Sequence, residues 1–180
     1  MLFTVGQRVS YPNHGVGTIE KIEEKQTGSC AANFYSLRLM ENNSLVFIPV
    51  ERAENIGVRP VISSYQCDKV MRFLSEDFEN YARDWKERYR TFSDKMQSGC
   101  IFAAAEVLKI LSYLSREKSL SFREQRMFDK ARYLVVSELA TVCRQPECRV
   151  QAKVEDLILR ALQKHSDSEG NIQAMSAAVH

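Results

Sequence analysis

Closely spaced glycines and a proline divide the first sixty residues into short segments, and this pattern limits what that part of the chain can fold into. Gly6, Gly15 and Gly17 provide positions for tight bends, and Pro12 fixes one backbone angle. The runs between these positions are rich in β-branched and aromatic residues and have the length of strands. We therefore predict strands near residues 7–11, 16–25, 33–40 and 45–49. Residues 41–44 then form a short hairpin connection.

Beyond about residue 60, the spacing of apolar residues changes to that of amphipathic helices. Ser63 or Ser64 can cap a first helix that ends near Leu74. Four more helices are predicted after it. The second starts at Trp85 and ends before residues 98–99, and the third covers about 100–116. The fourth starts at residue 122 behind a capping box, and the fifth covers about 148–164. Pro146 ends or interrupts the fourth of these five helices.

The two patterns together predict an α+β protein. Residues 1–62 form a small Tudor- or SH3-like β-barrel, and residues 63–164 form a compact all-helical domain. Residues 165–180 are polar and small, which indicates a disordered tail. The helix at 100–116 is apolar on most faces, so we expect it at the centre of the bundle, with Glu106, Lys109 and Arg116 as its polar edge.

Charge and composition restrict the classes of function. The net charge is +2, and residues 69–143 carry the basic surplus, with 14 Lys and Arg against 11 Asp and Glu. This surplus is too small for binding nucleic acid by charge alone, so a DNA contact would need a tether. No apolar run could span a bilayer and nothing resembles a signal peptide, so the expected location is the cytoplasm. Five scattered cysteines favour reduced thiols.

Motifs in both halves, in order and at matching spacing over about residues 1–145, resemble the CarD/CdnL family of bacterial RNA polymerase-binding transcription regulators. The first half is also similar to the polymerase-interacting module of the transcription–repair coupling factor. The matching motifs are Val5-Gly6, Val9-x-Tyr11-Pro12-x-His14-Gly15-Val16-Gly17, Ile48-Pro49, Ile56-Gly57-Val58-Arg59, Trp85-x-x-Arg88-Tyr89-Arg90, Ser98-Gly99, Ala105-Glu106-Val107-Leu108, Leu120-Ser121-Phe122, Met127, Lys130-Ala131-Arg132 and Ser137-Glu138-Leu139.

This resemblance implies a non-enzymatic regulator. The Tudor-like domain would bind the lobe of the RNA polymerase β subunit. The helical domain would contact promoter DNA in the minor groove, at the upstream edge of the melted bubble, and so stabilise the open complex. The expected protein is a cytoplasmic, nucleoid-associated monomer with no membrane contact.

Trp85 is the main candidate for the DNA contact. Periodicity alone favours a core position, because Trp85 begins a stripe that continues through Tyr89, Phe92 and Met96. The family resemblance instead implies a wedge that inserts at a base step. The candidate phosphate contacts are Lys86, Arg88, Arg90, Arg123, Arg126 and Lys130. For the last three, the residues alone favour a solvated charged face, and it is the family resemblance that implies a contact with DNA. Glu87 and Gln125 stand where many relatives are basic.

The candidate polymerase contact is the strand that contains Val46, Phe47 and Pro49. A proline limits donation to a sheet ladder, so this is expected to be an edge strand, which can accept a strand from a partner. Phe47 would be an exposed anchor or, alternatively, part of a small barrel core. Lys25 and Arg38 are candidate polar contacts at the rim.

Other chemistry finds little support. His14 lies in a glycine-flanked turn and is expected to stabilise that turn. His165 falls in the predicted tail, and Cys143 and Cys148 alone are too few for a zinc site. We predict no cofactor, no metal and no catalytic residue. The alternatives are an adaptor that binds polymerase without touching DNA and, less well supported, a redox or metal protein that uses Cys143 and Cys148.

Overall fold

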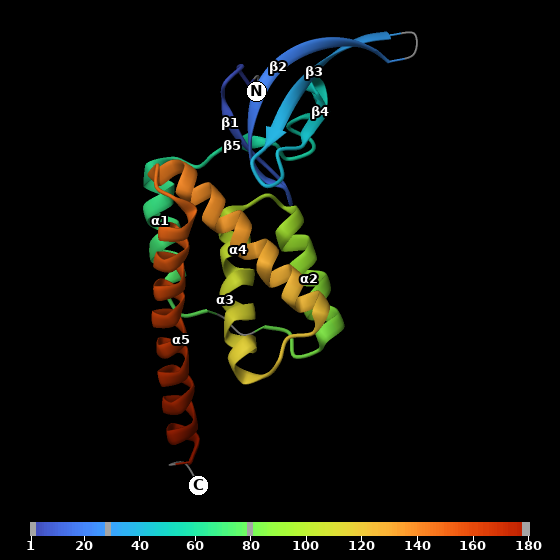
Figure 1. Cartoon of the computed structure of the whole chain (residues 1–180). Coiled ribbons are helices and arrows are strands. Elements are labelled where there is room, and N and C mark those ends of the chain that lie inside the picture. The colour runs from blue at the N-terminus through green and yellow to red at the C-terminus, as the bar shows by residue number, and fades with distance from the viewer. Residues whose placement is uncertain (1–2, 28–29, 79–80, 178–180) are drawn as a thin grey trace.

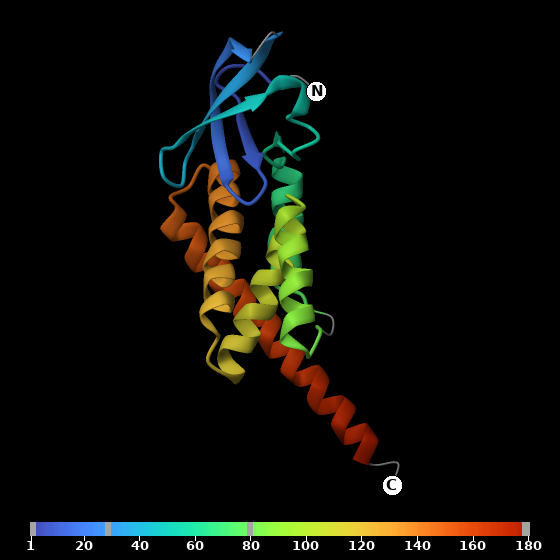
Figure 2. The same ribbon diagram turned by 90° about the vertical axis from the view of Figure 1, so that its right-hand side faces the viewer.

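The computed structural model describes residues 3–27, 30–78 and 81–177 of the 180-residue chain. An antiparallel sheet at one end is followed by five helices, which confirms the predicted α+β class (Figure 1). The sheet sits on one end of the helical bundle, and the C-terminal end of the last helix extends past the other helices at the opposite end (Figures 1 and 2). Along the described chain, no helix combines the length and apolarity that crossing a membrane requires.

The sheet contains five strands; the first four lie close to the predicted ranges, and the short β5 was not predicted. They are β1 (Arg8–Tyr11), β2 (Gly15–Thr27), β3 (Cys30–Leu39), β4 (Leu45–Pro49) and β5 (Arg59–Pro60), in the order β4-β3-β2-β1-β5. The register of β2 and β3 shifts between Ile19 and Lys21, which bends this long hairpin. The inner face of the sheet buries a small core that includes Val9, Ile19 and Tyr35. Because β4 stands at one end of the strand order, it is an edge strand, as its proline predicted.

The helices are α1 (Ser64–Leu74), α2 (Trp85–Gln97), α3 (Ile101–Glu117), α4 (Phe122–Cys143) and α5 (Glu147–Ala177). Side-chain caps fix three of the starts. Ser63 and Ser121 each complete a capping box, and Asp84 accepts hydrogen bonds from the backbone of Lys86 and Glu87. As predicted, α3 lies at the centre, where it contacts α1, α2, α4 and α5.

Two parts of the sequence prediction for the helical domain are wrong. Lys109 is fully buried rather than on a polar edge, because its Nζ donates to the carbonyl oxygens of Phe73, Glu76 and Asp77 at the end of α1, at 2.8, 3.2 and 3.4 Å. The region after residue 164 is helical up to Ala177 rather than a disordered tail, while residues 178–180 lie outside the described residues. No proline interrupts that stretch.

His165 gives the physical reason for the start of this extension. Its ring stacks on Phe78 at a centroid distance of 4.1 Å and meets the edge of Tyr113 at 5.1 Å. Its Nδ1 lies 2.7 Å from the carboxylate of Asp77. The buried face of α5 therefore continues past the predicted end of the helix, to His165.

Candidate functional site

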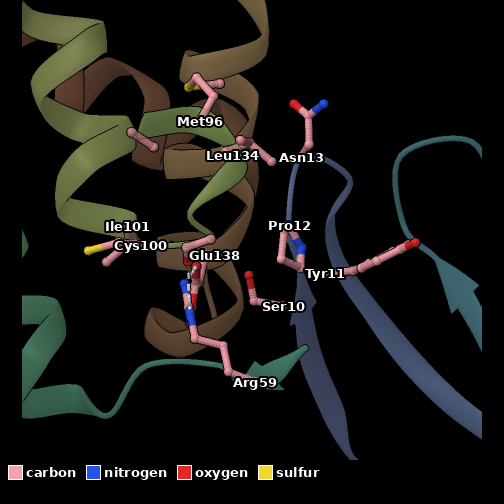
Figure 3. Close-up of a pocket in the computed structure, with 12 residues that line it drawn as sticks. Ser10, Tyr11, Pro12, Asn13, Arg59, Met96, Cys100, Ile101, Leu134 and Glu138 are labelled. Carbon is pink, nitrogen blue, oxygen red and sulfur yellow. Dashed lines mark hydrogen bonds and ion pairs between the residues drawn. The ribbon is translucent and has the colours of Figure 1, made fainter. Parts of the chain in front are cut away.

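A salt bridge joins the last strand of the sheet to α4 (Figure 3). Arg59 of β5 donates from Nη1 and Nη2 to the two carboxylate oxygens of Glu138, at 2.5 and 2.9 Å. Arg59 Nε donates to the carbonyl of Gly99 at 2.9 Å, and the backbone N–H of Ile62 donates to Glu138 at 3.0 Å. The Glu138 side chain is only 4% exposed and the Arg59 side chain is 29% exposed, so the carboxylate of this bidentate pair is shielded from solvent.

Glycines allow close packing at the β1–β2 turn, both within the β-domain and against the helical domain. A Cβ on Gly57 would lie 2.9 Å from Pro12 Cγ, and one on Gly99 would lie 3.0 Å from the same atom. Both glycines also have positive φ. Any other residue there would therefore adopt an unfavourable backbone conformation and bring its Cβ too close to Pro12. A Cβ on Gly15 would lie 2.8 Å from the ring of Tyr133 on α4. The cavity at this junction is about 20 Å³, so the two domains are closely packed.

Trp85 is exposed at the start of α2. It is the first residue of that helix, and 53% of its surface is accessible. Phe92 and Met96 of the same stripe are buried, while Tyr89 is half-buried. The core position that periodicity favours is therefore wrong for Trp85, because the stripe meets the bundle only one turn further along the helix. Lys86 Nζ lies 5.8 Å from the centre of the Trp85 ring.

Arg88, although next to Trp85 in the predicted contact set, is not on the surface. It is 3% exposed, and its guanidinium donates to the carbonyls of Ala82 and Arg83 and to Glu124 Oε1, at 3.0, 3.1 and 2.8 Å. The prediction of a phosphate contact at Arg88 is thus corrected: its charge binds the start of α2 to the start of α4. Arg90, two residues later, is exposed.

The carboxylate of Glu124 completes this contact between the two helix starts. Burial on its own raises the pKa of that carboxyl, but hydrogen bonds from Arg88 and Ser121 outweigh burial and lower it to about 2. Glu124 is also the third residue of α4 and accepts from the backbone N–H of Ser121 at 3.0 Å. One carboxylate therefore caps α4 and fixes α4 to α2.

A hollow of about 800 Å³ lies between the β1–β2 and β3–β4 turns, α2 and the first half of α4. Arg123, Arg126 and Lys130 line it, together with the rings of Tyr89 and Phe122. The structure thus brings these three predicted cations to one concave surface. Arg123 and Arg126 are exposed.

Lys130 is already paired. Its Nζ lies 2.9 and 3.0 Å from the two carboxylate oxygens of Glu41, in the turn between β3 and β4. This ion pair is a second polar link between the domains. Its carboxylate, on Glu41, is 33% exposed, against 4% for Glu138, so we expect it to contribute less than the Arg59–Glu138 pair.

Phe122 is a surface aromatic that the sequence prediction missed. It is 77% exposed and follows the capping residue Ser121, and the guanidinium of Arg126 lies 5.8 Å from its ring centre. The sequence contained a signal for this exposure, namely the position of Phe122 directly after the N-cap residue Ser121. The first residue of a helix lies before the turns that pack into the core. An exposed phenylalanine beside two arginines is typical of surfaces on which bases stack.

The second predicted contact surface is the edge strand β4. Phe47 is 43% exposed, Val46 and Pro49 are half-buried, and Ile48 faces the core. Lys25 Nζ lies 2.9 Å from the centre of the Phe47 ring, a cation–π contact that connects two predicted residues of this surface.

Arg38, the other predicted rim residue, is bound within the sheet. Its Nε and Nη2 each donate to the carboxylate of Glu20 at 3.0 Å, and Nη1 donates to the carbonyl of Asn43 at 2.9 Å. A partner could use this charge only by competing with Glu20.

The remaining candidate is His14, in the β1–β2 turn. His14 is exposed, its ring stacks on Tyr11 at 4.7 Å, and its backbone N–H donates to the Tyr11 carbonyl at 2.9 Å, so it does stabilise its turn. Within the described ranges, no group of three or more His, Cys, Asp or Glu is arranged to hold a metal ion.

Two family models match the chain in sequence order. The CarD-like/TRCF RID domain matches residues 3–62, and the CarD C-terminal domain matches residues 69–155. The chain is also similar to a protein of Bacillus subtilis (strain 168) named "Putative transcription factor YdeB". The two are 32% identical over 141 residues, which cover 78% of this chain and 92% of that protein. The chain therefore belongs to the CarD-like family of transcription regulators.

Proposed function

We propose that this protein is a non-enzymatic transcription regulator that binds RNA polymerase through its β-domain and promoter DNA through its helical domain. In this proposal it stabilises the open complex, acting as a nucleoid-associated cytoplasmic monomer. The observation that carries the DNA contact is the exposure of Trp85 at the start of α2. A flat aromatic ring that projects from a rigid helix start can insert between bases at the edge of a melted region, in the minor groove.

The charges around Trp85 support a contact with phosphates. Lys86 and Arg90 are exposed on α2, and Arg123 and Arg126 are exposed on α4. Phe122 adds a second ring on which an unpaired base can stack. The proposed DNA-contacting set is therefore Trp85, Phe122, Lys86, Arg90, Arg123 and Arg126, with Lys130 available only if it leaves Glu41.

For the polymerase contact, we propose that a strand of the β-subunit lobe pairs with β4. An edge strand offers unpaired backbone groups to a partner, and Phe47 with Lys25 would form the side-chain anchor beside it. Val46 and Pro49 complete the strand surface, and Arg38 belongs to its rim.

The close contact between the domains supports the proposal that a small surplus of basic residues is enough for binding promoter DNA. Once polymerase holds the β-domain, the helical domain is confined near the DNA, and binding there is governed by a high effective concentration. Because Arg59 and Glu138 join the domains and Pro12 packs between them, Trp85 would stay near the DNA for as long as polymerase holds the β-domain.

The test measures the lifetime of the open complex formed by purified RNA polymerase at a promoter with an unstable bubble. We expect the wild-type protein to lengthen this lifetime. The increase in lifetime should be at least tenfold smaller with the Trp85→Ala variant. Tyr65→Ala is the matched control, because Tyr65 is a comparably exposed aromatic on α1, at 68%. If Trp85→Ala retains polymerase binding and the full lifetime effect, the wedge proposal is wrong.

The adaptor function remains the second candidate. It is favoured by the internal use of Arg88 and Lys130, which leaves fewer cations for phosphates than the sequence suggested. An adaptor would bind polymerase equally well with and without promoter DNA. In that case a photo-crosslinker placed at position 85 or 122 would label protein alone.

A further inference from the structure

Two cysteines that are distant in the sequence lie side by side in the helical domain. Cys67 belongs to α1, and Cys143 is the last residue of α4. Their Sγ atoms are 3.3 Å apart and share a hydrogen bond. The sulfur atoms of a disulfide are about 2.05 Å apart, so an approach of about 1 Å would allow the bond to form.

We propose that Cys67 and Cys143 are a dithiol pair that hydroperoxides oxidise to an intramolecular disulfide. The protein then carries a redox modification site in its helical domain. This inference does not rest on the proposed binding of polymerase or DNA. It also replaces the pairing that the sequence suggested, because the partner of Cys143 is Cys67 rather than Cys148.

The environments of the two sulfurs give them different roles. Cys67 is 4% exposed, and burial, followed by its hydrogen bond with Cys143, raises the pKa of the Cys67 thiol to about 12. Cys67 therefore stays protonated near neutral pH, and its S–H can donate to the Cys143 sulfur. Cys143 is only half-buried, so it is the sulfur that an oxidant can reach.

The reaction has two balanced steps. The Cys143 thiolate attacks one oxygen of a hydroperoxide, ROOH; the S–O bond forms, the O–O bond breaks, and the leaving alkoxide takes a proton to become ROH. The Cys67 sulfur then attacks the sulfur of the resulting sulfenic acid; the S–S bond forms, the S–O bond breaks, and hydroxide leaves with the Cys67 proton as water. The two thiols are oxidised, and the peroxide is reduced to ROH and water.

The position of the pair gives the disulfide a structural effect. It would join α1 to the end of α4 and close a loop from residue 67 to residue 143. α1 directly follows the segment in which Arg59 and Ile62 bind Glu138 of α4. Oxidation would therefore add a covalent bond beside the domain junction, and we expect a higher midpoint of thermal unfolding.

The other described cysteine side chains form a natural control. Cys100 and Cys148 are both exposed, and within the part of the chain that the structure describes neither shares a hydrogen bond with a second sulfur. They are easier for an oxidant to reach than Cys143 but lack its neighbour. A reaction governed by exposure alone would modify these two first.

The experiment uses the full chain with Cys30→Ser, Cys100→Ser and Cys148→Ser, so that Cys67 and Cys143 are the remaining thiols. The reduced protein is treated with equimolar hydrogen peroxide, denatured, alkylated and analysed by intact mass and peptide mapping. We expect alkylatable thiols to fall from two to zero, a mass loss of two hydrogens, and one crosslinked peptide that dithiothreitol separates. Adding Cys143→Ser should abolish the crosslink.

Several outcomes would overturn the inference. They are two thiols that remain alkylatable, oxygen added to Cys143 without a crosslink, or a disulfide between two chains. Peptide mapping of the oxidised wild-type protein gives a second measurement that needs no substitution. There the alkylatable thiols should fall from five to three, and crosslinks from Cys100 or Cys148 instead would refute the pairing.

Discussion

Arg59 and Glu138, 79 residues apart in the sequence, form a bidentate ion pair that fixes the β-domain on α4. The Glu138 carboxylate also accepts from the backbone N–H of Ile62, so its removal would leave two donors without their partner. We expect Glu138→Ala to lower the free energy of unfolding by about 3–5 kcal/mol, measured by urea denaturation. Glu138→Gln should cost less, about 1–3 kcal/mol, because it still accepts one hydrogen bond.

A solvent-exposed ion pair provides the control for that measurement. Arg160 and Asp156 on α5 are 2.7 Å apart, but their side chains are 65% and 57% exposed. Asp156→Ala should therefore change stability by no more than about 0.5 kcal/mol. An equal loss in Asp156→Ala and Glu138→Ala would mean that the junction pair contributes no more than a surface pair.

The number of exposed cations predicts how the proposed DNA binding should depend on salt. Lys86, Arg90, Arg123 and Arg126 are exposed, whereas Arg88 is buried. Each phosphate contact on duplex DNA contributes about −0.9 to the slope of log K against log salt concentration, so we expect a slope no steeper than about −4. The measurement is fluorescence anisotropy of labelled promoter DNA that binds polymerase with and without this protein. The difference between the two salt slopes is the contribution of the protein. Arg126→Ala should reduce the slope by about 1, and Arg88→Ala should instead destabilise the fold.

Phe122 tests whether the hollow on α4 takes part in the DNA contact. We expect Phe122→Ala to shorten the open-complex lifetime about threefold without changing stability, because the ring is 77% exposed and contributes stacking only when a base is present. Leu159→Ala, at an exposed apolar position on α5, is the control. Equal lifetimes for the wild type and Phe122→Ala would remove Phe122 from the proposed set.

The edge strand is tested with the β-subunit lobe of polymerase. We expect Phe47→Ala to weaken binding about tenfold, or about 1.4 kcal/mol, measured by calorimetry. Ile56→Ala changes a comparably exposed apolar residue, at 40% against 43%, that lies outside β4 and should leave the affinity unchanged. If both variants bind as tightly as the wild type, the polymerase contact lies elsewhere.

The pKa of Glu124 predicts a loss of stability in acid. Since folding lowers this pKa from 4.5 to about 2, the ionised form stabilises the folded state above about pH 4.5, and the contribution is lost as the pH falls towards 2. Urea denaturation across this range should show a smaller loss for Glu124→Gln than for the wild type. Glu117→Gln, at an exposed position, should follow the wild type.

The sequence predicts the local features of this fold well. Ser63 and Ser121 mark helix starts through side chains only three residues away, and the strand limits follow from glycines and alternating residues. Local spacing cannot show which charges a distant element will neutralise. Arg88, Lys109 and Glu138 have the composition of surface residues, but their partners lie up to 79 residues away. The sequence therefore nominates the residues of the candidate site, and the structure shows which of their charges are exposed and which are already paired.

The Lys130 ammonium could bind either of two anions, the carboxylate of Glu41 or a phosphate of the proposed DNA ligand. The same ammonium that now binds Glu41 in the β3–β4 turn lines the hollow where a phosphate would arrive. A phosphate that captures Lys130 releases Glu41 and removes one of the links between the domains. In the proposed DNA complex, moving the β3–β4 turn away from α4 would by thermodynamic reciprocity free this cation for a phosphate. The Glu41 carboxylate and the phosphate would then compete for the same ammonium, so that the contact between the domains and the proposed binding of DNA would be coupled.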